Sequence, residues 1–473
     1  MSSDTQPVLT LAPAQNLRDS ASQLQVQPLG PNDVRYVDLG AGRATKELSK
    51  LEIFLRNAAG VESAYAKCAF VGGRGSGKST FLLHLESQLQ TEGLFTPIHI
   101  YLDPSLESDC DYSDLFLWMV DEIVRQFKDA GHPVDDGPLS QVTQWFAETT
   151  LTGLTDWKKE IELTAEAEAS AGAGILSSIL SIKLLARLKS MIVGSESTRK
   201  EIRRKVQNYS TELCRRVNDF LDHAREVLKR AGKPDRLLIV QDNLDRIRDR
   251  ERAQRLFDQG GDMLLELRAD LIYTSPLALH VAPLDITRTF PHVFLMPNVK
   301  VRLRNGKIHK PGIDAFVDLA SRRLAIDSVF ESEKVVRHLA EMSGGSLRDL
   351  IRLMDEAQLE AQVDGKQKVD MASAKAAVRK VALSFSRLLV PGSVYFPILA
   401  EVHRTKQEFV VPDGEPTLKS VSAARDFFAE LIGNGTVLEY NGDDSWYDVH
   451  PAVRDTRPFK DASAPQSPTP VQA

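Results

Sequence analysis

The sequence is poor in the residues that would place it in several common protein classes. Among its 473 residues are only 3 cysteines, Cys68, Cys110 and Cys214, which lie far apart and form no C-x-x-C pair. This spacing argues against a disulfide framework and against a zinc knuckle. The 10 histidines are scattered, without the H-x-x-x-H spacing of a metal-binding helix. We therefore expect a protein of a reducing compartment.

Long apolar runs are scarce as well. Residues 169–182 (ASAGAGILSSILSI) carry no charge, but this stretch is shorter than the ~20 apolar residues that a helix needs to span a bilayer. The basic residues Lys183 and Arg187 follow directly. The pattern favours a buried helix or a β-hairpin over membrane insertion, with contact at the lipid interface as the remaining alternative. A membrane partner is therefore not expected.

An excess of basic charge is also absent, because the net charge is −6 at pH 7. This balance excludes a chain that is basic throughout, although it is compatible with a local basic patch. The N-terminal residues lack the basic and then apolar pattern of a signal peptide, so we expect a cytoplasmic protein. The length exceeds the ~250 to 300 residues at which a single core stops growing, and we expect two or three domains.

What the sequence does contain is a phosphate-binding motif in residues 66–80 (AKCAFVGGRGSGKST). It fits G-x-x-x-x-G-K-[ST], with Gly72, Gly77, Lys78 and Ser79 at the fixed positions. Glycines let backbone N–H groups close around phosphate oxygens, and the following helix presents its positive N-terminal end. Lys78 is expected to reach the β and γ phosphates and Ser79 to ligate magnesium. A simple glycine-rich turn needs neither side chain, so the motif predicts ATP and Mg²⁺ as cofactors. The predicted nucleotide-binding residues are Gly72, Gly73, Arg74, Gly75, Ser76, Gly77, Lys78, Ser79 and Thr80.

A second signal lies in residues 236–246 (RLLIVQDNLDR). An uninterrupted apolar run that ends in aspartate is typical of a buried parallel strand that delivers a carboxylate to its C-terminal edge. Asp242 is predicted to hold the magnesium through water. Asp245 has two predicted roles, to orient the attacking water or to cap the next helix.

Five short apolar segments separated by helical patterns predict an α/β fold. The arrangement is that of a P-loop NTPase with a doubly wound, mostly parallel five-stranded sheet. The predicted strands lie at residues 66–71, 97–103, 236–246, 271–275 and 292–296. At the end of the fourth strand, Thr274 or Ser275 could contact the γ phosphate or the attacking water, although a hydroxyl there is also ordinary turn chemistry.

The segments around this core predict helical units. Residues 133–235 are too many for one crossover helix, so we expect a helical insertion. Residues 199–236 are interpreted as one long basic helix, which is either a solvated face or a nucleic-acid groove through Arg203, Arg204 and Lys205. In the helical region beyond residue 312, Arg348 follows a Gly-Gly-Ser turn and either reaches back to the nucleotide or pairs with a neighbouring acid.

Residues 394–454 contain the order helix, helix, hairpin, with the hairpin around Asn441-Gly442. This order predicts a winged-helix-like module. Its second helix offers Arg425 beside Asp426, so packing against the chain's own ATPase core or a protein partner is favoured over a DNA surface. The predicted units are a disordered tail at 1–34, an ATPase core at 35–311 with an insertion at 133–235, a helical lid at 312–388, the winged-helix-like domain at 389–455 and a disordered tail at 456–473.

Taken together, the motifs GGRGSGKST, LLIVQDNLDR, LIYTS and Gly-Gly-Ser-Leu-Arg resemble those of the AAA+ and STAND group of P-loop ATPases, in particular its ORC-like and KAP-like bacterial members. The resemblance covers residues 36–450. It implies that Thr274 or Ser275 is the first sensor and Arg348 the second. It also implies that Arg288 is an arginine finger acting on a neighbouring subunit of a homo-oligomer.

One position departs from this family pattern. Many relatives have an acidic residue directly after the magnesium aspartate, whereas this chain has Asn243. An amide cannot accept a proton as a general base. Asp245 matches the second aspartate of the KAP-like D-D-L-D-R string and would have to substitute, so slow hydrolysis is expected.

Two functions follow from these features. The first is an ATP-driven oligomerising switch that acts with a protein effector or regulator, in the manner of signalling or phage-defence ATPases. The second is a DNA-acting ATPase, a loader or an accessory of replication or transposition, that uses the winged helix and the basic helix 199–236. A small-molecule kinase is disfavoured, because kinases rarely need a lid of this length and a winged helix.

Overall fold

The structure is a computed structural model of the chain. It describes residues 12–62, 64–150, 173–247, 249–281, 286–387, 389, 395–407, 418–440 and 444–464.

A parallel sheet forms the centre of the molecule and confirms the predicted five-stranded, doubly wound fold. Its strands are β1 (Lys67–Gly72), β2 (Thr96–Tyr101), β3 (Leu237–Asp242), β4 (Asp270–Pro276) and β5 (Val293–Met296). They lie in the order β2-β3-β4-β1-β5, and every pairing is parallel. Because β1 has β4 on one side and β5 on the other, the crevice of the sheet opens at the C-terminal end of β1.

Alternate residues of each strand face opposite sides of the sheet, and both sides are covered. On one side, Cys68 and Phe70 pack with leucines of α2 (Glu47–Ala59) and α3 (Lys78–Thr91). On the other side, Ala69 and Val71 belong to the larger core that includes α4 (Tyr112–Asp129). This two-sided burial explains why the strands are apolar almost throughout.

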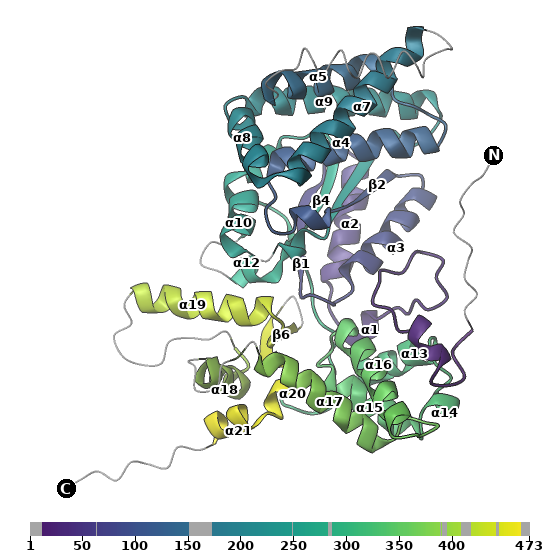
Figure 1. Ribbon diagram of the computed structural model, residues 1–473, viewed down its shortest axis with the longest axis vertical. Coiled ribbons are helices and arrows are strands. Elements are labelled where there is room, and N and C mark those ends of the chain that lie inside the picture. The colour runs from purple at the N-terminus through teal and green to yellow at the C-terminus, as the bar shows by residue number, and fades with distance from the viewer. Residues whose placement is uncertain are drawn as a thin grey trace.

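The predicted insertion between β2 and β3 consists of helices. Figure 1 shows α5 (Asp136–Thr150), α7 (Ala173–Gly194), α8 (Glu196–Gln207) and α9 (Ser210–Arg230) with α4 at one end of the sheet. The predicted single helix over 199–236 is wrong, because Asn208 and Tyr209 form a turn between α8 and α9. No glycine or proline marks this break, so the apolar spacing runs through it.

The uncharged stretch 169–182 is helical from Ala173 onward, where α7 begins, and its first four residues lie outside the described part of the chain. This favours the helix over the β-hairpin among the predicted alternatives. Across the described ranges, no helix is long and apolar enough to cross a membrane.

The lid region and the C-terminal region follow the sheet. The lid helices are α13 (Lys310–Ser321), α14 (Ile326–Val329), α15 (Glu333–Met342), α16 (Leu347–Val363) and α17 (Met371–Ser386). The C-terminal elements are α18 (Tyr395–Thr405), α19 (Leu418–Gly433), the antiparallel strands β6 (Val437–Tyr440) and β7 (Trp446–Val449), α20 (Pro451–Arg454) and α21 (Arg457–Ser463). The predicted helix, helix, hairpin order is present. Its hairpin tip, Asn441-Gly442, lies outside the described residues, and the winged-helix assignment stays a prediction.

Short helical segments complete the described chain. They are η1 (Asp19–Ser22), α1 (Gly40–Arg43), η2 (Pro104–Leu106), η3 (Leu244–Arg246), α10 (Arg250–Gln254), the π-helix η4 (Arg255–Gln259), α11 (Gly261–Leu265), α12 (Leu277–Val281) and η5 (Ile286–Arg288).

The C-terminal region packs against the rest of its own chain. Asp426 of α19 forms a 2.5 Å ion pair with Arg250 of α10. The hydroxyl of Tyr440 donates a hydrogen bond to the carbonyl of Gly344, at the lid turn. Gly433, at the end of α19, lies against Ala278 of α12. These contacts favour the predicted packing on the chain's own core over a free DNA-reading helix.

Both predicted disordered tails need correction. Ala14 exchanges 2.9 Å backbone hydrogen bonds with Arg323 and Ala325, and Leu17, Leu24 and Leu29 are buried. An extended segment buries side chains one at a time, so it lacks periodicity just as a disordered tail does.

At the other end, residues 457–463 form α21, and its Phe459 is buried. Residues 1–11 and 465–473 lie outside the described part, and the predicted domain boundaries remain predictions.

Candidate functional site

The phosphate-binding motif forms the turn between β1 and α3. Gly75 and Gly77 have φ values of +82° and +97°, which residues with a Cβ rarely adopt. Lys78 is only 5% exposed. Its Nζ donates to the carbonyls of Gly72 (2.8 Å) and Gly73 (3.1 Å) and forms a 2.8 Å ion pair with Asp245. The structure therefore brings together the two predicted residues Lys78 and Asp245.

Asp245 does not cap the next helix, so that predicted alternative is wrong. The cap of α10 is Asp249, whose side chain accepts from the N–H of Arg252. Arg74 also contacts this segment, because its Nη2 donates to the carbonyl of Arg246 at 2.9 Å. The end of β3 is thus tied to the phosphate loop by the Lys78 ion pair and by Arg74.

Asp242 lies at the end of β3 and is 1% exposed. Burial alone would raise the pKa of Asp242, but His99, the Ser79 hydroxyl and the N–H of Asn243 together hold it below its ordinary value. Within the described residues, Oδ2 of Asp242 has no hydrogen-bond partner. An ionised carboxylate beside a serine hydroxyl fits a hard divalent cation, so Ser79 and Asp242 could hold Mg²⁺.

Two residues that the motifs did not indicate complete this cluster. His99 of β2 lies between Asp242 and Glu86 of α3, with Nδ1 2.6 Å from Oε1 of Glu86 and Nε2 3.5 Å from Oδ2 of Asp242. Burial alone would lower the pKa of His99, but the two carboxylates raise it to about 9. Burial raises the pKa of Glu86, and His99 partly offsets this. The sequence signal that could have indicated this cluster is His99, a polar residue between two isoleucines in the segment that forms β2.

The backbone of Asn243 explains part of its identity. Asn243 has a φ of +67°, in the left-handed region that asparagine tolerates better than most residues. Thr274 lies beside this turn. Its hydroxyl accepts from the N–H of Leu244 (3.1 Å) and donates to the carbonyl of Gln241 (3.3 Å). Thr274 therefore fixes the end of β3, and neither Thr274 nor Ser275 is among the residues that line the cavity described next.

A cavity of about 890 Å³ opens in front of the phosphate loop. Basic side chains predominate among the described residues that line it, which suits a polyanionic ligand. The basic residues are Arg35, Arg43, Arg74, Lys78, Arg246, Arg323, Arg348 and Arg352, and the acidic ones are Asp38, Glu52, Glu107 and Asp245. Arg43 is buried, which lowers its pKa to about 10, and its guanidinium donates to the carbonyls of Ser76 and Pro297.

The N-terminal segment forms one wall of this cavity. Figure 1 shows it in purple, passing beside α3 toward α13. The N–H of Leu29 donates to Oγ1 of Thr80 at 3.1 Å, and Tyr36 stacks on His84 with ring centroids 3.6 Å apart. Because Pro28 and Leu39 also line the cavity, this wall offers apolar surface for a nucleotide base.

The lid contacts the phosphate loop directly. The carbonyl of Gly75 accepts hydrogen bonds from the N–H groups of Leu347 (3.0 Å) and Arg348 (3.4 Å). A Cβ on Gly75 would lie 2.5 Å from Cβ of Arg348, so only glycine fits this approach. The structure thus brings Arg348 to the loop, as the first of its two predicted alternatives required. Arg288 is exposed on η5 and does not line the cavity, so its role toward a neighbouring subunit stays a prediction.

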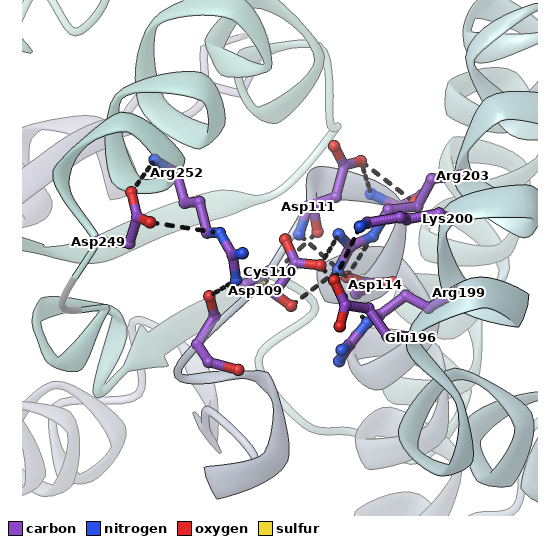
Figure 2. A network of polar contacts seen from close by, with 12 residues as sticks. Asp109, Cys110, Asp111, Asp114, Glu196, Arg199, Lys200, Arg203, Asp249 and Arg252 are labelled. Carbon is purple, nitrogen blue, oxygen red and sulfur yellow. Dashed lines mark hydrogen bonds and ion pairs between the residues drawn. The ribbon is translucent and has the colours of Figure 1, made fainter.

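Arg203, one of the three residues of the predicted basic groove on helix 199–236, does not lie on a free surface. Figure 2 shows Arg203 of α8 among carboxylates from the start of α4. Arg203 forms a 2.9 Å ion pair with Asp109, and its Nε donates to Asp114 at 3.1 Å. Arg199 lies 3.6 Å from Asp109 as well. These arginines neutralise buried acids, because α8 packs against the loop before α4, and that arrangement was not visible from their spacing along the helix.

Comparisons with known proteins give structural similarities only. No protein-family model and no curated protein sequence matches this chain. Among solved structures, it is similar to the Cdc6p protein of Pyrobaculum aerophilum (14% identity, TM-score 0.39, covering 94% of this chain and 96% of that one). It is also similar to the ORC2 protein of Aeropyrum pernix in its ADP form (11% identity, TM-score 0.43, 94% and 96%) and to a Walker-type ATPase of Pyrococcus abyssi (14% identity, TM-score 0.38, 91% and 98%).

Proposed function

We propose that this protein is an ATP-binding, slowly hydrolysing AAA+-like P-loop ATPase that acts as an oligomerising nucleotide switch. The observation that carries the proposal is the convergence of Lys78, Ser79 and Asp242 at one crevice, with the lid turn at Arg348 bonded to the same phosphate loop. A nucleotide bound at this loop would contact both the core and the lid. The number of its phosphates could therefore set the angle between the core and the lid. The use of such a switch in signalling or phage defence stays a prediction.

The ion pair between Lys78 and Asp245 indicates how the site would work. ATP would place its phosphates against the backbone N–H groups of the loop, and Lys78 would exchange Asp245 for phosphate oxygens. Ser79 and Asp242 would hold Mg²⁺, which neutralises phosphate charge when bound. Asp245, released from Lys78, then has a free carboxylate that can accept a proton from water. Slow turnover is expected, because Asn243 stands where many relatives have an acidic residue and Asp245 has to substitute for it.

This proposal predicts assembly that depends on the bound nucleotide. Mass photometry of the full chain is carried out with ATP, with ADP and without nucleotide. Larger particles should appear only in the ATP condition. Arg288 is exposed and precedes β5, so its replacement by alanine should leave ATP binding unchanged and reduce ATP hydrolysis in the assembled state. Identical particle sizes in all three conditions would reject the switch.

A second candidate function, a DNA-acting ATPase, is favoured by a different surface from the one predicted. Residues 302–310 (RLRNGKIHK) form a tight hairpin between β5 and α13, closed by the hydrogen bond from the N–H of Leu303 to the carbonyl of Lys307 (2.8 Å). Arg304, Lys307 and Lys310 are exposed on it. Across the described ranges, these three side chains form no ion pair or hydrogen bond.

The same hairpin borders a basic groove of about 700 Å³ between the lid and the C-terminal region. Arg302, at the base of the hairpin, lines this groove together with Lys375 and Arg379 of α17. Lys375 and Arg379 are exposed and lie one helical turn apart. Arg302 is ion-paired with Glu341, which also lines the groove, so the exposed cations of the hairpin and of α17 are the ones that fit a nucleic-acid backbone.

Replacing Arg304, Lys307 and Lys310 together with alanine should therefore weaken DNA binding. It should also reduce the slope of log K against log salt by up to about 3, because each phosphate contact contributes nearly one unit. The matched control replaces Arg204, Lys229 and Lys233, which are exposed cations of the insertion, and should leave the slope unchanged. Fluorescence anisotropy with a labelled duplex measures both variants. No DNA binding by the unmodified chain at low salt would reject this candidate.

A further inference from the structure

A buried row of three side chains connects helix α3 to the predicted magnesium residue. Val240 and Asp242 share one face of β3, because residues two apart on a strand point the same way. His99 is the register partner of Val240 on the neighbouring strand β2. Helix α3 covers this face and contributes Glu86. The order across the face is therefore carboxylate, imidazole, carboxylate.

The surroundings of this row are apolar, so the fold does not require it to be polar. Leu82, Leu85 and Leu89 of α3 are all buried on this face. The side chains of Glu86, His99 and Asp242 are 8%, 10% and 1% exposed. Placing three polar groups among leucines costs free energy unless they satisfy one another. Leucine at position 99 would avoid the cost of burying an imidazole among leucines, so packing alone does not explain His99.

We propose that His99, anchored by Glu86, is a positioning residue that fixes the carboxylate of Asp242 for magnesium-bound nucleotide. The inference rests on the proposed nucleotide-binding function. Oδ1 of Asp242 accepts the N–H of Asn243 at 2.7 Å, and Oδ2 faces Nε2 of His99 at 3.5 Å. Contacts from two sides restrict rotation of the carboxylate.

The separation of 3.5 Å is informative in itself. It is longer than a hydrogen bond, so His99 attracts Oδ2 without occupying its lone pairs. Oδ2 therefore remains able to accept a hydrogen bond from a water molecule of the metal. The 2.6 Å contact between Nδ1 of His99 and Oε1 of Glu86 fixes the orientation of the imidazole ring. Groups that orient a metal-binding carboxylate in this way commonly change metal affinity by about 10- to 100-fold when removed.

The test compares nucleotide binding with and without magnesium. The dissociation constant of a fluorescent ATP analogue is measured for the full chain in Mg²⁺ and in EDTA. His99→Leu should lose about 10- to 100-fold of the affinity gained from Mg²⁺ and keep its affinity in EDTA. His99→Gln, whose amide can donate near the position of Nε2, should recover most of the gain. His292→Leu, which changes a histidine that contacts the ring of Phe54 just before β5, is the matched control and should behave as the unmodified chain.

A second pair of variants covers the case in which His99→Leu does not fold. Glu86→Gln keeps an oxygen that can accept from Nδ1 and should retain most of the magnesium-dependent gain, whereas Glu86→Leu should lose a large part of it. Equal losses in Mg²⁺ and EDTA, or an unchanged gain in both His99→Leu and Glu86→Leu, would overturn the inference. If Mg²⁺ does not raise the nucleotide affinity of the unmodified chain, the inference about His99 is also overturned, although the proposal of ATP binding stands. No binding in either condition would instead reject the proposed function.

Discussion

Replacing Lys78 with alanine is expected to lower the ATP affinity of the full chain by about 100-fold. Lys78 would supply charge-assisted hydrogen bonds to phosphate oxygens, which together would contribute about 3 kcal/mol, and each 1.4 kcal/mol corresponds to a factor of ten. The loss is reinforced by Asp245, whose carboxylate would keep its charge beside the phosphates without the 2.8 Å ion pair that now offsets it. Isothermal titration calorimetry in Mg²⁺ measures the change.

The Asp245→Asn variant separates the two roles of this ion pair. It releases Lys78 without removing it, so ATP should bind at least as tightly as to the unmodified chain. Hydrolysis should fall, because an amide cannot accept a proton. Unchanged ATP affinity in Lys78→Ala, with the thermal unfolding temperature preserved, would contradict the placement of the phosphates at this loop.

Replacing Arg203 with methionine is expected to have the largest effect on stability. Asp114 is fully buried, and Arg203 is the cation that pairs with it. Removing one partner of a buried ion pair leaves an uncompensated charge and commonly costs about 3 to 5 kcal/mol. Arg204→Met, on the neighbouring exposed residue of α8, should change the free energy of unfolding by less than about 0.5 kcal/mol. Urea unfolding followed by circular dichroism compares the two variants.

The stability loss in Arg203→Met should depend on pH. Burial raises the pKa of Asp114 to about 6, and Arg203 opposes this rise. Without Arg203, the pKa of Asp114 rises further, so the folded state binds its proton more tightly than the unfolded state does. The variant should therefore lose stability as the pH increases from 5 to 8, and its deficit should be smallest near pH 5. Equal deficits at both pH values would show that Asp114 is not the group left unpaired.

The sequence predicted the parts of this molecule that depend on local spacing. Lys78 was predicted from the phosphate-loop motif and Asp242 from the apolar run that ends in aspartate. Lys78 begins α3 and Asp242 ends β3, while their roles stay predictions. The five strands followed from short apolar segments separated by helical patterns. The helix start that carries Arg348 followed from the Gly-Gly-Ser turn before it, in which Ser346 is the cap, and the role of Arg348 toward a nucleotide stays a prediction.

The features that the sequence did not predict depend on contacts between distant segments. His99 and Glu86 meet only because β2, β3 and α3 share one face of the sheet. Arg203 and Asp114 are 89 residues apart in the sequence. The sequence alone therefore cannot distinguish an arginine on an exposed basic helix from one that pairs with a buried acid, because the packing of α8 against α4 decides between them. The N-terminal wall of the cavity is extended and has no periodicity, which made it resemble a disordered tail.

Direct titration of ATP into the full chain tests the central claim most simply. The geometry of Lys78, Ser79 and Asp242 predicts saturable binding of one ATP per chain, and tighter binding in Mg²⁺ than in EDTA. Absence of saturable binding at millimolar ATP and Mg²⁺, from a chain that is folded by circular dichroism, would contradict it.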